Sequence, residues 1–199
     1  MTEQDITLKA EKFNLPIVEP GLWASVEKKD DLSPGSHVLV VYKDRIQPTL
    51  WGWWFWKKNK LGKPVKNMVI NTRVETLFEK IEMGDPKYLE VISAKRVLIL
   101  ANGFFEWPDK KKTLLQVPGE NAFALAGLAF KSKQANGTVV ETVSIITIPP
   151  DDDFLKFHNR MPVAVPPERY TEWLAGGPFT VDQLNNFFKS HLQFESRAA

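Results

Sequence analysis

The sequence predicts an α+β fold, and three observations support this prediction. Apolar, strand-like segments outnumber helical ones along the 199 residues. Strands and helices do not alternate regularly, which argues against a parallel sheet built from strand–helix–strand units. Three of the strand-like segments follow one another directly, at residues 113–117, 123–130 and 139–148. The turn-forming pairs Pro118-Gly119 and Asn136-Gly137 predict hairpins between them.

Three further strands are expected earlier in the chain. Residues 37–42 (HVLVVY) predict a strand that is entered through the turn-forming run Ser33-Pro34-Gly35. Residues 67–70 (NMVI) predict a second, short strand. Residues 96–101 (RVLILA) form a continuous apolar run, which is typical of a strand buried on both faces.

Two helices are expected between these strands. Thr72 is followed three residues later by Glu75, a capping-box pattern that predicts a helix running to about residue 83. In this interpretation Glu75 is the reciprocal cap of Thr72 and has no catalytic role. Gly84 ends that helix, and Pro86 predicts the start of a second one that runs through residue 93.

The last third of the chain is expected to be mostly helical. The acidic run at residues 151–153 leads into a predicted short helix that ends before His158. Pro167 predicts a helix through residue 174, and Thr180 with Gln183 forms a second capping-box pattern.

Composition limits the function classes that the chain can serve. The chain is 43% hydrophobic and has no linker-like segment, so one domain over residues 1–199 is predicted. The net charge of +2 gives little global attraction to nucleic acid, so any such binding needs a local basic patch. The absence of cysteine excludes a thiol nucleophile, a thiolate metal ligand and a disulfide within these residues. The polar first residues and the lack of a run of about 18 apolar residues predict a cytoplasmic protein without a membrane span.

Tryptophans are concentrated in the run WGWWFW, and lysines follow at once. Trp51, Trp53, Trp54 and Trp56 can either pack against the core or provide a stacking surface for bases. The cations Lys57, Lys58, Lys60 and Lys63 fit a contact with single-stranded nucleic acid, but they also fit an ordinary solvated loop.

Two titratable residues stand out as candidates for acid–base chemistry. Glu106 lies between Phe105 and Trp107 at the end of an apolar strand, and alternation places it on the opposite face from both aromatic rings. If that face lines a cleft, burial raises the carboxyl pKa and favours general acid–base catalysis; otherwise Glu106 is an exposed strand residue. His158 lies in a connection before Met161-Pro162, a type of location where functional side chains concentrate, although a lone histidine is often structural.

The other two histidines have less informative surroundings. His37 opens a strand, and His191 is expected in an amphipathic C-terminal helix. The three histidines show no metal-ligand spacing, so neither a metal nor another cofactor is predicted.

Asn71 and Arg73 lie where a predicted strand passes into a predicted helix. The amide of Asn71 can hold a ligand oxygen. Arg73 adds a cation to a helix N-terminus, which already favours anions, and phosphate binding is therefore plausible.

Three short motifs in this order resemble the signature motifs of the SRAP family, the SOS response-associated peptidases or abasic-site processing proteins. They are NTRVET at residues 71–76, GFFEW at residues 103–107 and HNRMP at residues 158–162. The SPG turn and WGWW resemble further family motifs, so the resemblance is strongest over residues 33–174. It implies one SRAP-like domain with a mostly antiparallel, barrel-like sheet and peripheral helices.

The resemblance also implies a function and a set of site residues. Family members bind single-stranded DNA that carries an abasic site and link covalently to its ring-opened aldehyde. The family's asparagine, glutamate and histidine correspond to Asn71, Glu106 and His158. Its DNA contacts correspond to Arg73 and Arg160, and to the region of Pro34 and the tryptophan cluster, where Trp56 is the expected stacking residue. Lys57 and Lys58 are added to these expected DNA contacts. The protein is expected to be a monomer in the cytoplasm that associates with the nucleoid when it binds DNA.

The chain departs from the family at the nucleophile. Family members begin Met-Cys, whereas this sequence begins Met1-Thr2. Once Met1 is removed, the α-amine of Thr2, with a pKa of about 7.7–8.0, can form a Schiff base, but its hydroxyl closes a ring far less well than a thiol. A different natural start and a loss of catalysis are the other two interpretations. An abasic-site enzyme (crosslinking, lyase or nominal peptidase) and a catalytically silent DNA-binding module therefore both stay open, whereas ordinary peptidase action lacks an evident nucleophile.

Overall fold

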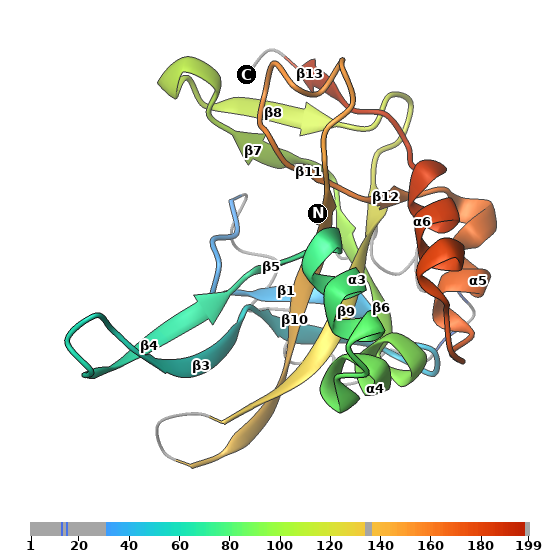
Figure 1. The fold of residues 1–199 in the computed structure, drawn as a ribbon. Coiled ribbons are helices and arrows are strands. Elements are labelled where there is room, and N and C mark those ends of the chain that lie inside the picture. Colours follow the sequence, from blue (N-terminus) through green and yellow to red (C-terminus); the bar gives the residue numbers. More distant parts are fainter. Residues whose placement is uncertain (1–12, 14, 16–30, 134–136, 198–199) are drawn as a thin grey trace.

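The computed structural model describes residues 13, 15, 31–133 and 137–197, and it has the α+β fold that the sequence predicts. Within that part of the chain, strands form one eight-stranded sheet, one three-stranded sheet and one two-stranded ribbon. Four α-helices lie around them (Figure 1).

The large sheet is mixed but mostly antiparallel. Its path runs in the order β11-β10-β2-β1-β6-β9-β12, with β5 paired to β10 beside it. Among the strands of the described residues, only the pairs β10–β2 and β10–β5 are parallel. Because β10 also pairs with β9, the path β10-β2-β1-β6-β9 returns to its first strand; the mostly antiparallel sheet with peripheral helices that the resemblance implied is confirmed, although we do not call it a true barrel. Its strands are β1 (His37–Val41), β2 (Ile46–Trp51), β5 (Asn71–Arg73), β6 (Arg96–Ala101), β9 (Phe123–Lys133), β10 (Val139–Ile148), β11 (Met161–Pro162) and β12 (Ala164–Val165).

Two smaller strand groups extend from this sheet. At the top of Figure 1, β7 (Phe104–Glu106), β8 (Thr113–Gln116) and β13 (Glu195–Arg197) form the three-stranded sheet. At the left, β3 (Trp53–Lys58) and β4 (Pro64–Val69) form the ribbon. The hairpin predicted at Pro118-Gly119 is therefore wrong, because β8 pairs with β7 and β13 instead of β9. The hairpin between β9 and β10 is confirmed by their antiparallel pairing, although Asn136 lies outside the described residues.

The helices pack in two pairs. The first pair is α3 (Val74–Glu82) and α4 (Pro86–Ala94), and the second is α5 (Tyr170–Leu174) and α6 (Val181–Lys189) (Figure 1). The predicted helix from Pro167 is realised as a short 3-10 segment, Pro167–Arg169, followed by α5. Both α4 and α6 begin where the sequence predicts, α4 capped by the carboxylate of Asp85 and α6 by the Thr180–Gln183 capping box. None of the helices in the described residues is long and apolar enough to cross a membrane.

The capping box predicted at Thr72 is wrong. Arg73 is the N-cap of α3 and makes no side-chain cap hydrogen bond. Thr72 belongs to β5, and its buried hydroxyl forms a 2.7 Å hydrogen bond with the hydroxyl of Ser144 on β10. Sheet pairing therefore overrides the local capping pattern.

Two further predictions about the last third of the chain are also wrong. Residues 152–157 form consecutive turns instead of a short helix, and the Asp151 carboxylate accepts a 2.8 Å hydrogen bond from the Phe154 N–H. His191 lies beyond the end of α6.

The strand β6 divides the core, as its continuous apolar sequence predicts. Leu98 and Leu100 pack in the cluster shared with the helices, which contains Leu77 and Trp173. Val97 and Ile99 pack in a second cluster on the other face of the sheet.

Arg96, the first residue of β6, is a buried cation held by main-chain carbonyls. Its guanidinium donates to the carbonyl oxygens of Ile92, Trp173 (2.6 Å) and Gly177 (2.8 Å). Burial lowers the pKa of Arg96 to about 10, which still leaves the side chain charged at neutral pH. The side chain therefore joins both helix pairs to the sheet.

Candidate active site

A cavity of about 590 Å³ opens on the face of β6 that carries Ile99. It is lined by five of the residues singled out from the sequence: Pro34, Asn71, Glu106, His158 and Arg160. The predicted convergence of Asn71, Glu106 and His158 is therefore observed, although up to 87 positions separate them in the sequence. Their chemical roles stay predictions.

Strand β10 brings two of the motifs together. Asn71 of β5 is the register partner of Ile145, and Met161 of β11 is the register partner of Ile148. Strands β5 and β11 therefore pair with the same C-terminal part of β10, and the two motifs lie at the same end of the sheet.

The third motif enters through Gly103, which precedes β7. A Cβ atom at this position would lie 2.8 Å from Leu114 Cδ1 and 3.0 Å from the carbonyl oxygen of Leu115. Glycine therefore allows the β6–β7 connection to lie against β8, and this close approach places Glu106 at the cavity.

Glu106 and His158 face each other across the cavity. The Glu106 Oε1 atom lies 4.0 Å from His158 Nδ1, and the side chains are 19% and 46% exposed. Burial raises the pKa of the Glu106 carboxyl, and the nearby His158 offsets part of that rise. A carboxyl group with a raised pKa exchanges protons more readily near neutral pH, so the pair is suited to general acid–base chemistry.

The main chain of Arg160 holds the His158 ring. His158 Nδ1 lies 3.1 Å from the Arg160 N–H and 2.9 Å from the Arg160 carbonyl oxygen. A bare Nδ1 accepts from the N–H, and a protonated Nδ1 donates to the carbonyl, so the ring keeps a partner in both states. Its Nε2 has no hydrogen-bond partner among the described residues and is available to a ligand.

The Arg160 side chain is bound to Glu75. Its two terminal nitrogens donate to the Glu75 carboxylate at 2.7 and 2.9 Å, and one of them also donates to the Thr147 carbonyl oxygen at 2.7 Å. This hydrogen bonding lowers the pKa of Glu75. The sequence-based role of Glu75 as the cap of Thr72 is therefore wrong.

Asn71 and Arg73 present exposed side chains from β5, directly before α3. The Asn71 amide makes no hydrogen bond to any described residue, so it is available to a ligand at the cavity wall. Arg73 is not among the residues that line the cavity.

The other predicted DNA contacts lie elsewhere. Lys57 and Lys58 are exposed on β3, away from the cavity lining. Trp56 belongs to β3, but its side chain lies outside the described part of the structure, and so does Thr2.

Two tryptophans at the cavity have roles that the sequence did not distinguish. Trp51 Nε1 donates to the Ile70 carbonyl oxygen at 2.9 Å, and this hydrogen bond fixes the indole ring at the cavity wall. Trp107 is 56% exposed at the cavity and lies beside Phe105, with ring centroids 6.5 Å apart. The rings of Phe105 and Trp107 lie together, as alternation along the strand predicts, and both residues line the cavity with Glu106.

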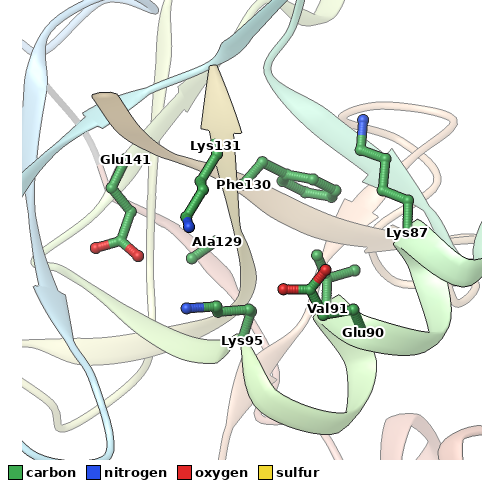
Figure 2. Close-up of a pocket in the computed structure, with 8 residues that line it drawn as sticks. All are labelled: Lys87, Glu90, Val91, Lys95, Ala129, Phe130, Lys131 and Glu141. Carbon is green, nitrogen blue, oxygen red and sulfur yellow. The ribbon is translucent and has the colours of Figure 1, made fainter. Parts of the chain in front are cut away.

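A second, smaller hollow of about 230 Å³ lies between α4 and the hairpin of β9 and β10. Figure 2 shows the amines of Lys95 and Lys131 turned toward the side on which the Glu141 carboxylate lies. The Glu141 carboxylate already forms an ion pair with Arg45, at a distance of 2.8 Å. The Lys87 amine lies 3.8 Å from the centre of the Trp53 ring, so Trp53 packs within the protein. None of the site residues predicted from the sequence lines this hollow.

No group of three or more His, Cys, Asp or Glu residues in the described part of the chain is arranged to hold a metal ion. Among the groups that line the larger cavity, the Glu106 carboxyl, the His158 imidazole and the Asn71 amide are suited to proton transfer and to holding an oxygen.

Comparison with known proteins identifies the family. The sequence matches the family described as "SOS response associated peptidase (SRAP)" over residues 5–197. The chain belongs to the SRAP family. The resemblance of its three motifs is thereby confirmed.

Curated relatives of this SRAP chain are named abasic site processing proteins. YobE of Bacillus subtilis strain 168 is 32% identical over 155 residues, which cover 72% of this chain and 67% of YobE. YoqW of Bacillus phage SPbeta is 32% identical over 156 residues, and YedK of Escherichia coli K12 is 28% identical over 159. The match covers 72% of this chain in both cases, and 65% of YoqW and 63% of YedK. The chain thus spans about two thirds of the length of these relatives.

Solved structures share the fold. A protein of Bacteroides thetaiotaomicron superposes with a TM-score of 0.69 at 19% identity, covering 96% of this chain and 87% of that one. A protein of Bordetella bronchiseptica superposes with a TM-score of 0.67 at 19% identity, covering 96% and 94%.

Proposed function

We propose that this SRAP chain binds single-stranded DNA that carries an abasic site and reacts with the ring-opened aldehyde as part of the DNA damage response. The observation that carries the proposal is the Glu106–His158 pair, 4.0 Å apart in a cavity that Asn71 also lines. The names of the curated relatives support the same substrate.

The chemistry requires an amine and three proton transfers. The amine attacks the aldehyde carbon, a carbon–nitrogen bond forms, and a proton moves from nitrogen to oxygen to give a carbinolamine. Protonated Glu106 then gives a proton to the departing hydroxyl, which leaves as water, while neutral His158 takes the proton from nitrogen. The product is a Schiff base, and the Asn71 amide holds the sugar or phosphate oxygen beside it.

The proposed nucleophile is the α-amine of Thr2 after removal of Met1. Since the 199 residues contain no cysteine, this adduct is not locked by a thiol and hydrolyses readily. The proposed DNA contacts are Arg73 and Arg160, together with one of the two ribbon lysines, Lys57 or Lys58, and with Pro34 and Trp56.

The test uses a single-stranded oligonucleotide with one abasic site and the natural N-terminus verified by mass spectrometry. Borohydride reduces a Schiff base to a stable amine, so we expect a crosslink on denaturing gels that is much stronger with borohydride than without it. An oligonucleotide with a tetrahydrofuran in place of the abasic sugar has no aldehyde and is the control. Glu106→Gln should reduce trapping much more than it weakens binding.

A catalytically silent DNA-binding module is the second candidate, and the absence of a thiol favours it. It predicts equal binding to the abasic and tetrahydrofuran strands and no trapping with borohydride. A stable crosslink without reductant would contradict the amine-only chemistry, and a lack of preference for single strands over duplex would contradict both candidates.

A further inference from the structure

Four residues form a continuous series of contacts from helix α3 to the cavity. Glu75 binds the Arg160 guanidinium, the Arg160 main chain holds the His158 ring, and His158 faces Glu106. The first contact joins residues 85 positions apart.

The link between Glu75 and Arg160 has the geometry of an anchored pair. Each terminal nitrogen of Arg160 donates to one oxygen of Glu75. This two-point contact fixes the orientation of the guanidinium as well as its distance from the carboxylate. The added bond to the Thr147 carbonyl ties the guanidinium to β10. Arg160 is only 17% exposed and its Nε atom is buried without a hydrogen-bond partner, so the side chain has little freedom to swing toward solvent.

This anchoring also affects the charge of the cavity. The Glu75 carboxylate is bound to the two terminal nitrogens of Arg160, the donors with which an arginine usually binds a phosphate. A DNA phosphate would have to compete with Glu75 for Arg160, whereas Arg73, which lies outside the cavity, has no ion pair to any described residue.

We propose that Glu75 is a positioning residue. It holds Arg160 against β10, and so keeps the His158 ring in place opposite Glu106, and it competes with the DNA phosphate for the Arg160 guanidinium. Where DNA is concerned, this inference rests on the proposed function.

The inference predicts opposite effects on two measurable properties. Glu75→Gln loses the charge and one of the acceptor oxygens, so Arg160 and the segment that holds His158 become looser. The same change exposes an uncompensated cation at the cavity, which favours a polyanion. A role limited to stability would instead weaken the His158 site and DNA binding together.

The experiment compares Glu75→Gln and Glu75→Asp with Glu79→Gln. Glu79 is an exposed residue one turn further along α3, and its side chain makes no ion pair with a described residue. Glu79→Gln therefore removes the same charge without touching Arg160. The first readout is the ring 15N NMR signals of His158, assigned among the three histidines with His158→Gln. It requires no DNA and no catalysis.

We expect the His158 ring signals to shift and broaden in Glu75→Gln, to be largely retained in Glu75→Asp, and to be unchanged in Glu79→Gln. The second readout is the affinity for a single strand with tetrahydrofuran in place of the abasic sugar. It should be several-fold higher for Glu75→Gln than for Glu79→Gln.

The two readouts separate the possible failures. Unchanged His158 signals in a folded Glu75→Gln protein would overturn the positioning role. Altered His158 signals with weakened DNA binding would overturn the competition between Glu75 and the DNA phosphate for Arg160. If no variant and not even the unmodified chain binds DNA, the proposed function fails, whereas the NMR result still decides the positioning of His158.

Discussion

The hydroxyl groups of Thr72 and Ser144 form a 2.7 Å hydrogen bond between β5 and β10, and both residues are buried. The Thr72 side chain therefore lies on the same face of the sheet as Ser144, and alternation along β5 places the side chains of Asn71 and Arg73 on the opposite face. One buried hydrogen bond thereby fixes which face of β5 carries the site residues.

Removing this bond should destabilise the protein. Thr72→Val keeps the shape but leaves the Ser144 hydroxyl without its partner, at a cost of about 1–3 kcal/mol in the free energy of unfolding. Urea unfolding measures the change. The double variant with Ser144→Ala should cost less than the sum of the two single variants, and strict additivity would show that the hydroxyls do not interact.

The raised pKa of Glu106 predicts a pH-dependent stability difference. Between the usual glutamate pKa of about 4.3 and the raised folded value, the folded state holds more proton than the unfolded state, so this group's contribution to stability falls as pH rises. Glu106→Gln cannot lose a proton. Its stability relative to the unmodified chain should therefore increase from pH 4 upward and level off above the folded pKa. A pH-independent difference in urea unfolding would contradict the raised pKa.

The buried Arg96 should be among the most sensitive positions of the fold. Arg96→Met leaves three carbonyl oxygens without their donor and should cost about 3 kcal/mol or more in the free energy of unfolding. Lys189→Met, at an exposed position of α6, is the matched control and should change stability by less than about 0.5 kcal/mol. Similar losses in both variants would mean that the carbonyl contacts contribute nothing.

Gly103→Ala should disturb the site through β7. The new methyl group meets Leu114 and the carbonyl of Leu115, so β7 must shift and carry Glu106 away from His158. We expect weaker borohydride trapping with less effect on DNA affinity. Adding Leu114→Ala relieves one of the two contacts and should restore part of the trapping. If the glycine variant traps normally, the close approach does not set the position of Glu106.

Lys57 and Lys58 should not contribute equally to DNA binding. Successive residues of a strand point to opposite faces of the β3–β4 ribbon, so we expect only one of them to face a DNA strand. Each phosphate contact to a single strand adds about 0.7 to the slope of log affinity against log salt. One of the variants Lys57→Gln and Lys58→Gln should therefore lower the slope by about that amount and the other leave it unchanged. Equal effects would show that both lysines contact phosphate.

The parts of the fold that the sequence predicts well depend on local signals. Pro86 and the Thr180–Gln183 pair set helix starts within one turn, and the apolar run of β6 identifies a buried strand. The capping pattern at Thr72 failed because its outcome depends on Ser144, 72 positions away. Pro118-Gly119 indicates a chain reversal, but it carries no information about which strand β8 pairs with.

The candidate site shows the same limit. Each motif could be recognised by its residue types, and the family resemblance implied that they meet. The partner of Glu75 could not be predicted, because a glutamate three residues after a threonine has the same pattern whether it caps a helix or binds Arg160. Only the pairing of β5 and β11 with the two sides of β10 brings that arginine to it.

The attachment of both motifs to β10 has a consequence for engineering. Asn71 and Met161 are paired with positions 145 and 148 of one strand, so their spacing along the sheet is set by about 10 Å of extended main chain and not by any side chain. Substitutions within the cavity can alter its chemistry and leave this dimension intact. A single inserted residue in that stretch of β10 would move one motif past the other by about 3.3 Å and turn its side chains to the opposite face.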